Sequence, residues 1–139
     1  MIAILNKSFS KVNSKLDTMS KKIVIVDDSA SIREVVKYTL ETAGFEVLVG
    51  TDGSDAIHFF DGQDISLLIT DLHMPQVNGI ELIKQVRNLD QYQRIPILFL
   101  TTESQKEKKM EAKDAGATGW LIKPFVPQKL LAAISKVLR

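Results

Sequence analysis

Short apolar runs alternate with segments of helical periodicity from about residue 21 onward, and this alternation limits the fold more than any other feature. A fifth candidate strand, 45–49, contains Glu46, which favours a sheet edge because strands covered on both faces are continuously apolar. The other four apolar runs are 23–26, 65–70, 95–100 and 120–122. Strands that alternate with helices predict βαβ units, and therefore an α/β fold with a parallel sheet covered by helices on both faces.

Helix signals fill the gaps between the expected strands. Ser31 and Glu34 have the spacing of a capping box, and Gly44 suits the position just beyond the end of that first helix. Ser104 and Glu107 repeat the capping-box spacing before a helix that runs to about residue 115, and Pro127 suits a first helical turn. Two further helices are expected near 54–62 and 80–86.

Each of the four continuous apolar runs is followed by a polar residue, a carboxylate in two cases, a hydroxyl in the third and an ammonium in the fourth. These residues are Asp27 and Asp28, then Asp71, Thr101 and Lys123. Ligands of open parallel sheets bind at the carboxyl ends of the strands, so these side chains are expected to converge at one edge. Clustered carboxylates repel one another unless a cation is present, and an all-oxygen ligand set suits Mg²⁺. The pattern predicts a site for a divalent cation and a phosphoryl group.

The pair Asp27–Asp28 also has a simpler interpretation, a helix N-cap followed by a solvated neighbour. The coincidence with the polar ends of the other strands favours the cation site.

Composition excludes several other classes. The length of 139 residues fits one domain, and 18 basic against 17 acidic residues give no reason to expect nucleic acid as a partner. With no cysteine, neither a disulfide framework nor a thiolate metal site is possible. No apolar stretch is long enough for a membrane span, and the N-terminus lacks a secretory apolar region, so a cytoplasmic location is expected.

The segments around these polar residues, taken together, resemble the receiver domain of two-component response regulators, most closely the single-domain chemotaxis regulators of the CheY type. The resemblance covers residues 21–139 and rests on five matching segments in order, which are Val26–Ser29, Asp71–Pro75, Asn78–Gly79, Leu100–Glu103 and Ala115–Phe125. It implies a doubly wound, flavodoxin-like sheet of five parallel strands in the order 2-1-3-4-5.

The resemblance also implies a role for each site residue. Asp71 would accept a phosphoryl group from a histidine kinase of the CheA type. Asp28, Asp71 and the backbone carbonyl of His73 would bind Mg²⁺, while Asp27 positions the ion, partly through water. Lys123 would neutralise phosphoryl charge, and the hydroxyl of Thr101 would detect the phosphoryl oxygen. Lys123–Pro124 matches the family's cis peptide.

Three further features have weaker assignments. Trp120 takes the position of the family's switch aromatic, although a lone tryptophan in a strand is more often a packing residue. His73 and Glu103 are expected to tune the lifetime of the phosphoryl group, and with His58 the only other histidine a transition-metal site is improbable. The lysine-rich helix 104–115 is either a solvated face or, with the fifth strand and last helix, the surface that binds output partners.

We therefore expect a phosphoacceptor switch that is not itself an enzyme and has no output domain of its own. Its partner would be a flagellar motor switch or another regulator. A phosphate sink or a phosphorelay intermediate remains open, as does an aspartyl-phosphate phosphotransferase, although such enzymes commonly carry an acid where this chain has His73. A pseudo-receiver is disfavoured because the acceptor, acids and lysine are all present.

Residues 1–20 form an N-terminal extension of different character. Apolar residues recur at spacings of three and four, at Ile2, Leu5, Phe9, Val12, Leu16 and Met19. The extension is a loosely docked segment, a helix that self-associates or packs on the domain, or a basic membrane-surface helix. A monomer is expected.

Overall fold

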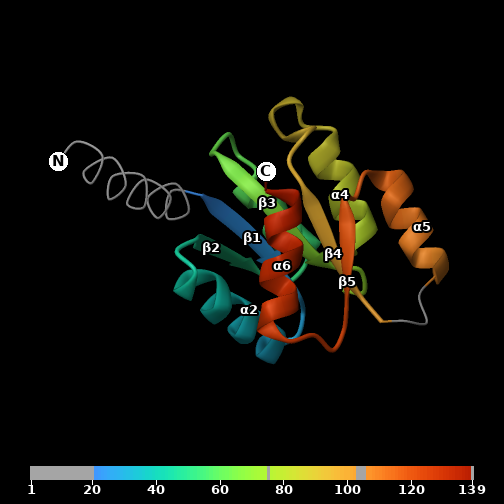
Figure 1. Cartoon of the computed structure of the whole chain (residues 1–139). Coiled ribbons are helices and arrows are strands. Elements are labelled where there is room, and N and C mark those ends of the chain that lie inside the picture. The colour runs from blue at the N-terminus through green and yellow to red at the C-terminus, as the bar shows by residue number, and fades with distance from the viewer. Residues whose placement is uncertain (1–20, 75, 103–105, 139) are drawn as a thin grey trace.

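The chain forms one parallel sheet with helices on both faces. The computed structural model describes residues 21–74, 76–102 and 106–138. The strands are β1 (Lys22–Val26), β2 (Glu46–Gly50), β3 (Ile65–Asp71), β4 (Ile97–Thr101) and β5 (Gly119–Ile122). They pair in the order β2-β1-β3-β4-β5, all neighbours parallel, which confirms the expected topology and the edge position of β2 (Figure 1).

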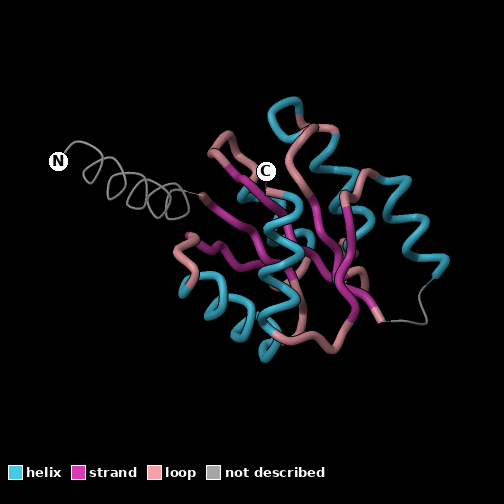
Figure 2. Tube along the Cα trace, in the orientation of Figure 1, coloured by secondary structure: helices cyan, strands magenta, loops and turns pink. Residues whose placement is uncertain are grey.

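The helices divide between the two faces of the sheet (Figure 2). They are α2 (Ala30–Thr42), α3 (Gly53–Ala56), α4 (Gly79–Arg87), α5 (Lys106–Ala115) and α6 (Pro127–Val137), with short 3-10 helices η1 (Ile57–Phe59) and η2 (Asp90–Tyr92). Side chains of α2 and α6 join one buried apolar cluster, whereas those of α3, α4 and α5 join the other.

Alternation along the strands explains these two clusters. In β1, Ile23 and Ile25 face α2 and α6, while Val24 and Val26 face the opposite layer. β3 begins with a register shift against β1, where Lys22 pairs with Ile65 but Ile23 pairs with Leu67. The extra residue places Ile65 and Leu67, two positions apart, in opposite apolar clusters.

Two helix boundaries differ from the sequence prediction. The first helix begins at Ala30 with Ser29 as its N-cap, whose Oγ accepts a hydrogen bond from the Ile32 N–H at 3.4 Å, so the predicted capping box at Ser31 is wrong. Its end was predicted correctly, since Gly44 takes a φ of 99° just beyond Ala43. The segment predicted as one helix at 54–62 is shorter and splits into α3 and η1.

Helix α6 begins at Pro127, as predicted. Residues 104–105 of the second predicted capping box lie outside the described residues, as does the whole N-terminal extension. Within the described part of the chain, the helices are too short or too polar to cross a membrane.

Candidate phosphoacceptor site

The sheet topology brings the predicted polar residues together at the carboxyl edge. Asp27 follows β1, Asp71 ends the central strand β3, Thr101 ends β4, and Lys123 follows β5. The chain leaves β1 toward β2 on one side and leaves β3 toward β4 on the other, so β1 and β3 flank the point at which strand order reverses. Ligand sites of doubly wound sheets lie at such a point.

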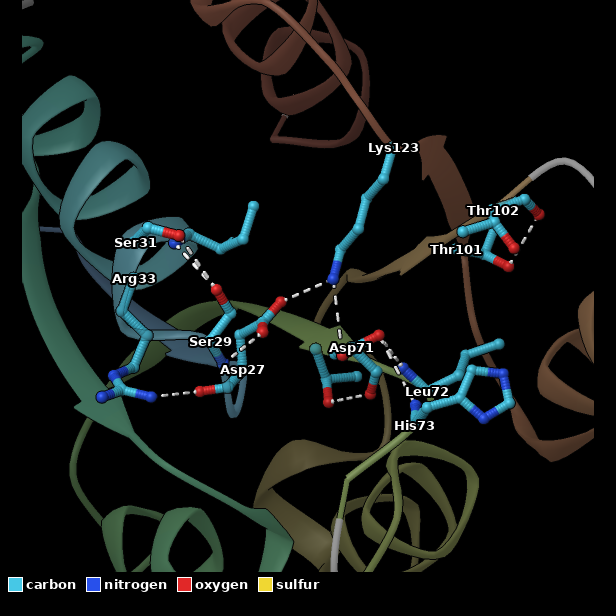
Figure 3. A network of polar contacts seen from close by, with 12 residues as sticks. Asp27, Ser29, Ser31, Arg33, Asp71, Leu72, His73, Thr101, Thr102 and Lys123 are labelled. Carbon is cyan, nitrogen blue, oxygen red and sulfur yellow. Dashed lines mark hydrogen bonds and ion pairs between the residues drawn. The ribbon is translucent and has the colours of Figure 1, made fainter.

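Asp71 is almost buried and is held by its own backbone neighbours (Figure 3). Its Oδ1 accepts hydrogen bonds from the N–H groups of Leu72 at 2.8 Å and His73 at 3.5 Å. Its Oδ2 lies 3.4 Å from the Nζ of Lys123. The carboxylate is therefore fixed in orientation, with one oxygen bound to the backbone and the other directed toward the lysine.

Lys123 connects the two buried carboxylates across the sheet edge. Its Nζ donates to Oδ2 of Asp27 at 2.9 Å and also contacts Asp71 (Figure 3). The peptide between Lys123 and Pro124 is cis, as predicted. Burial alone would lower the pKa of Lys123, but the hydrogen bond to Asp27 and the charges of both aspartates together raise it. The ammonium is therefore retained at neutral pH.

The electrostatics of Asp71 show that the site lacks positive charge. Burial raises the pKa of its carboxyl group above the usual value, and the charge of Asp27 raises it further. Lys123 and the backbone hydrogen bond from His73 lower the pKa only in part. One ammonium does not balance the surrounding carboxylates, so an additional cation would stabilise the ionised site.

The donor set fits a hard divalent cation. Asp27, Asp28 and Asp71 each offer a carboxylate oxygen, and these atoms lie within 4.8 Å of one another. Asp27 is fully buried, with its Oδ1 accepting from the Ser29 N–H at 2.8 Å, whereas Asp28 is exposed at the opening. Oxygen ligands on a partly open edge suit Mg²⁺, which keeps several of its waters.

A polar pocket of about 340 Å³ opens beside the acidic cluster. Asp28, His73 and Lys108 are among the residues that line it, so a cation from α5 lies across the opening from the acids. The His73 side chain is exposed and lines this pocket. Glu103, the other residue predicted to tune the phosphoryl lifetime, lies outside the described residues.

Thr101 and Trp120 take up distinct positions. Thr101 is buried, and its Oγ1 donates to the carbonyl of Thr102 at 3.2 Å (Figure 3). Trp120 is 51% exposed, with its ring centroid 6.2 Å from that of Phe99 and 5.5 Å from the Nζ of Lys109. The hydroxyl therefore bonds to the backbone and the indole faces outward.

Sequence reasoning missed two supports of the site. Arg33 donates from Nη1 to the backbone carbonyl of Asp27 at 2.7 Å and so fixes the turn that carries the acids. At Gly79 a Cβ would lie 2.1 Å from the carbonyl oxygen of Asp71, so only glycine lets α4 begin this close to the acceptor. The Asn78–Gly79 pair indicated a loop, but the contact with Asp71 depends on tertiary structure.

Comparison with known proteins agrees with this geometry. The family model for the response regulator receiver domain matches residues 23–135. Chemotaxis protein CheY1 of Helicobacter pylori is 40% identical over 119 residues, which cover 84% of this chain and 96% of that protein. Chemotaxis protein CheY-3 of Vibrio cholerae is 33% identical over 138 residues, covering 99% and 97%.

A solved structure extends the agreement to three dimensions. The structure of the chemotaxis response regulator CheY4 of Vibrio cholerae superposes with a TM-score of 0.81 at 47% identity, covering 85% of this chain and 98% of that one. The strand-end site lies within the region that the family model matches. The chain belongs to the response regulator receiver domain family.

Proposed function

We propose that this chain is a phosphorylation-driven switch of chemotaxis signalling, which accepts a phosphoryl group on Asp71 and changes its binding to a partner protein in the cytoplasm. One observation supports the proposal above all others. Asp71 ends the central strand, lies within 4.8 Å of two further carboxylates and contacts Lys123 at 3.4 Å. The similarity to chemotaxis proteins of the CheY type supports the pathway.

In the proposed reaction, a carboxylate oxygen of Asp71 attacks the phosphorus of a phosphohistidine on a histidine kinase of the CheA type. A P–O bond forms, the P–N bond breaks, and the histidine of the kinase leaves with its electron pair. Oδ2 is the oxygen directed toward Lys123, whose ammonium would shift from Asp71 to an oxygen of the incoming group. Positioning and charge neutralisation supply most of the catalysis in phosphoryl transfer.

Asp28, Asp71 and the backbone carbonyl of His73 would hold Mg²⁺, with Asp27 positioning the ion partly through water. The ion, when bound, supplies neutralisation of the charge that develops on the phosphoryl oxygens. Asp27 also holds Lys123 at 2.9 Å, so it orients the second positive charge of the site. His73 and Glu103 would set the lifetime of the acyl phosphate by controlling the approach of water.

Thr101 would detect the phosphoryl group. Its hydroxyl now donates to the carbonyl of Thr102, and a phosphoryl oxygen on Asp71 would compete for that donor. Movement of Thr101 would open space beside β4 for the ring of Trp120, which stands outward on β5. Phosphorylation would thus favour one of two arrangements of Trp120 and α5.

The surface formed by α5, β5 and α6 would bind the output partner. Two hollows of about 450 and 600 Å³ lie there, and both are lined by Trp120 and Lys129. Met110 and Val126 add apolar side chains that are 63% and 53% exposed. A partner such as a flagellar motor switch protein would present apolar and acidic side chains to this basic, partly apolar surface.

Incubation with Mg²⁺ and acetyl phosphate tests the acceptor. Intact-mass measurement should detect one added phosphoryl group on the parent and none on Asp71→Asn. The exposed Asp61→Asn is the matched control and should label like the parent. Equal labelling of Asp71→Asn would refute the assignment.

Two measurements separate the switch from its alternatives. A pull-down that compares phosphorylated with unphosphorylated protein should retain the output partner preferentially in one state. A phosphate sink would show no such difference but would drain phosphoryl groups from the kinase. Turnover of a broad set of phosphomonoesters would instead favour a phosphotransferase enzyme.

A further inference from the structure

Helices α2 and α6 cover the face of the sheet opposite to α4 and α5 (Figure 1). An apolar groove runs between them. It consists of two hollows of about 610 and 330 Å³ that share Ala43 and Leu131. The larger hollow extends to Pro127 at the start of α6, and the smaller extends to Leu138 and Lys21. The groove therefore follows the length of α6 and ends where the described chain begins.

Helix α2 carries apolar side chains on two sides. Val36 and Leu40 are fully buried against the sheet, as in any amphipathic surface helix. Val35 and Tyr38 point away from the sheet, 49% and 74% exposed, and both line the groove. Together with Leu131 of α6, these two side chains give the groove an exposed apolar lining.

The chain itself supplies a segment that matches the groove. Twenty residues precede Lys21, and Lys21 lines one end of the groove, so a turn at this point would lead the segment back along it. As a helix, residues 2–19 would extend about 27 Å at 1.5 Å per residue, against about 20 Å for the 13 residues of α2. The segment is therefore long enough to cover the groove.

The composition of that segment provides the complementary face. Its apolar residues recur at spacings of three and four over the whole length, which places them on one side of a helix. They are Ile2, Leu5, Phe9, Val12, Leu16 and Met19. Ser8, Ser10, Asn13 and Ser14 lower the helix propensity of this segment, so such a helix gains most of its stability when it buries its apolar side. Tethering at Lys21 favours this segment over a second copy, because it raises the local concentration to the millimolar range.

We propose that residues 1–20 fold back as an amphipathic helix in the α2–α6 groove, with their apolar side against Val35, Tyr38 and Leu131. The docked segment lies along α6 and forms an additional layer over that face. Its first residues reach the Pro127 end of the groove. This inference is independent of the proposed phosphoacceptor function.

A single spin label tests the docking in the full chain. The protein contains no cysteine, so Ser10→Cys gives one attachment site, and Ser10 lies on the helix face away from the apolar residues. Docking predicts strong broadening of the amide signals of α2 and α6, with the α4 signals much less affected. Absence of any selective broadening on α2 and α6 would overturn the proposal.

Mixing identifies the occupant of the groove. Spin-labelled protein without ¹⁵N is mixed with ¹⁵N protein that carries no spin label. Any broadening of the amide signals in this mixture arises between molecules. Docking in cis predicts none. Broadening in the mixture equal to that in the labelled chain would overturn the proposal in favour of a second copy.

Substitutions on both sides complete the test. Phe9→Asp with Leu16→Asp should abolish the broadening in cis, whereas Lys11→Asp, on a different face of the segment, should leave it intact. Tyr38→Asp alters an exposed side chain of the groove, so the domain should stay folded while the broadening falls several-fold. Unchanged broadening in both apolar variants would contradict the proposed contact.

Discussion

Helices α4 and α5 lie side by side on the same face of the sheet but are held very differently (Figure 1). Helix α4 buries five of its nine residues, Gly79, Ile80, Leu82, Ile83 and Val86. Helix α5 buries only Ala112 among its ten. Helix α4, which begins beside Asp71, is thus anchored in the core. Helix α5, which lies beside Trp120, buries little of its surface. A switch requires this division, because a well-packed element resists movement.

The largest expected effect comes from truncating the core side of α4. Leu82 is fully buried, so Leu82→Ala should lower the free energy of unfolding by about 2–5 kcal/mol through lost burial and a residual cavity. Met110→Ala on α5 removes a side chain that is 63% exposed and should change stability by less than about 0.5 kcal/mol. Urea denaturation of both variants measures the contrast. Similar losses would contradict the difference in anchoring.

A smaller but more local effect is expected at the start of α4. Gly79→Ala would place a Cβ against the carbonyl of Asp71 and the Cα of Leu72, forcing α4 away from β3. Overpacking of this kind costs about 1–3 kcal/mol, and the displaced acceptor should label more slowly with acetyl phosphate. Gly62→Ala, where the added Cβ would meet only Oε1 of Gln91 at 3.9 Å but φ is +107°, controls for destabilisation by backbone strain far from Asp71. It should destabilise the fold without slowing the labelling.

Removing the charge of Asp71 should stabilise the fold, in contrast to the substitutions in α4. Burial and the nearby Asp27 raise the pKa of Asp71, so the folded state is favoured when this carboxyl is protonated. That contribution is present below the unfolded pKa and is lost as the pH rises through the folded one. At pH 7 without Mg²⁺, Asp71→Asn should therefore raise the free energy of unfolding, because asparagine carries no charge to bury.

The pH series provides the check on this sign. The advantage of Asp71→Asn over the parent should shrink as the pH falls through the raised pKa of Asp71, because the parent carboxyl is then protonated as well. Mg²⁺ should stabilise the parent more than the variant, because the ion neutralises the same charge. Amide exchange in α5 should remain unchanged, since Asp71→Asn adds no phosphoryl oxygen that could attract the Thr101 hydroxyl. A variant less stable than the parent at pH 7 would contradict the electrostatic account.

The sequence could predict the strands and the residues at their ends, but not every local boundary. The strands followed from the apolar runs, whereas their order followed from the resemblance to receiver domains. The site followed from polar residues placed at strand ends, because the sheet topology brings Asp27, Asp71 and Lys123 together. The start of α2 was misassigned since Ser29 and Ser31 are equivalent by type. Only the turn held by Asp27 makes Ser29 the cap.

The supports of the site were harder to predict because they depend on tertiary contacts. From the sequence, Arg33 is an ordinary helical arginine. In the structure the turn after β1 brings the Asp27 carbonyl to 2.7 Å from its Nη1. From the sequence, Gly79 is only a loop residue, because its close contact with Asp71 exists only once β3 and α4 are packed together. Local patterns identify chemistry at strand ends, whereas the residues that orient it appear only in three dimensions.

The smallest expected effect lies at the corner between α5 and β5, where Lys109 stands 5.5 Å from the ring of Trp120. Lys109→Gln should change stability by less than about 1 kcal/mol, since an exposed cation–π contact contributes little. Trp120 is the only tryptophan, so its emission reports this corner alone. Loss of the contact should shift the emission of the unphosphorylated protein and reduce the further change on adding acetyl phosphate with Mg²⁺. Lys113→Gln, on the same helix, serves as the control and should preserve both signals. If Lys109→Gln destabilises the protein as strongly as a core substitution in α4, then α5 is anchored after all, and the switch must lie elsewhere.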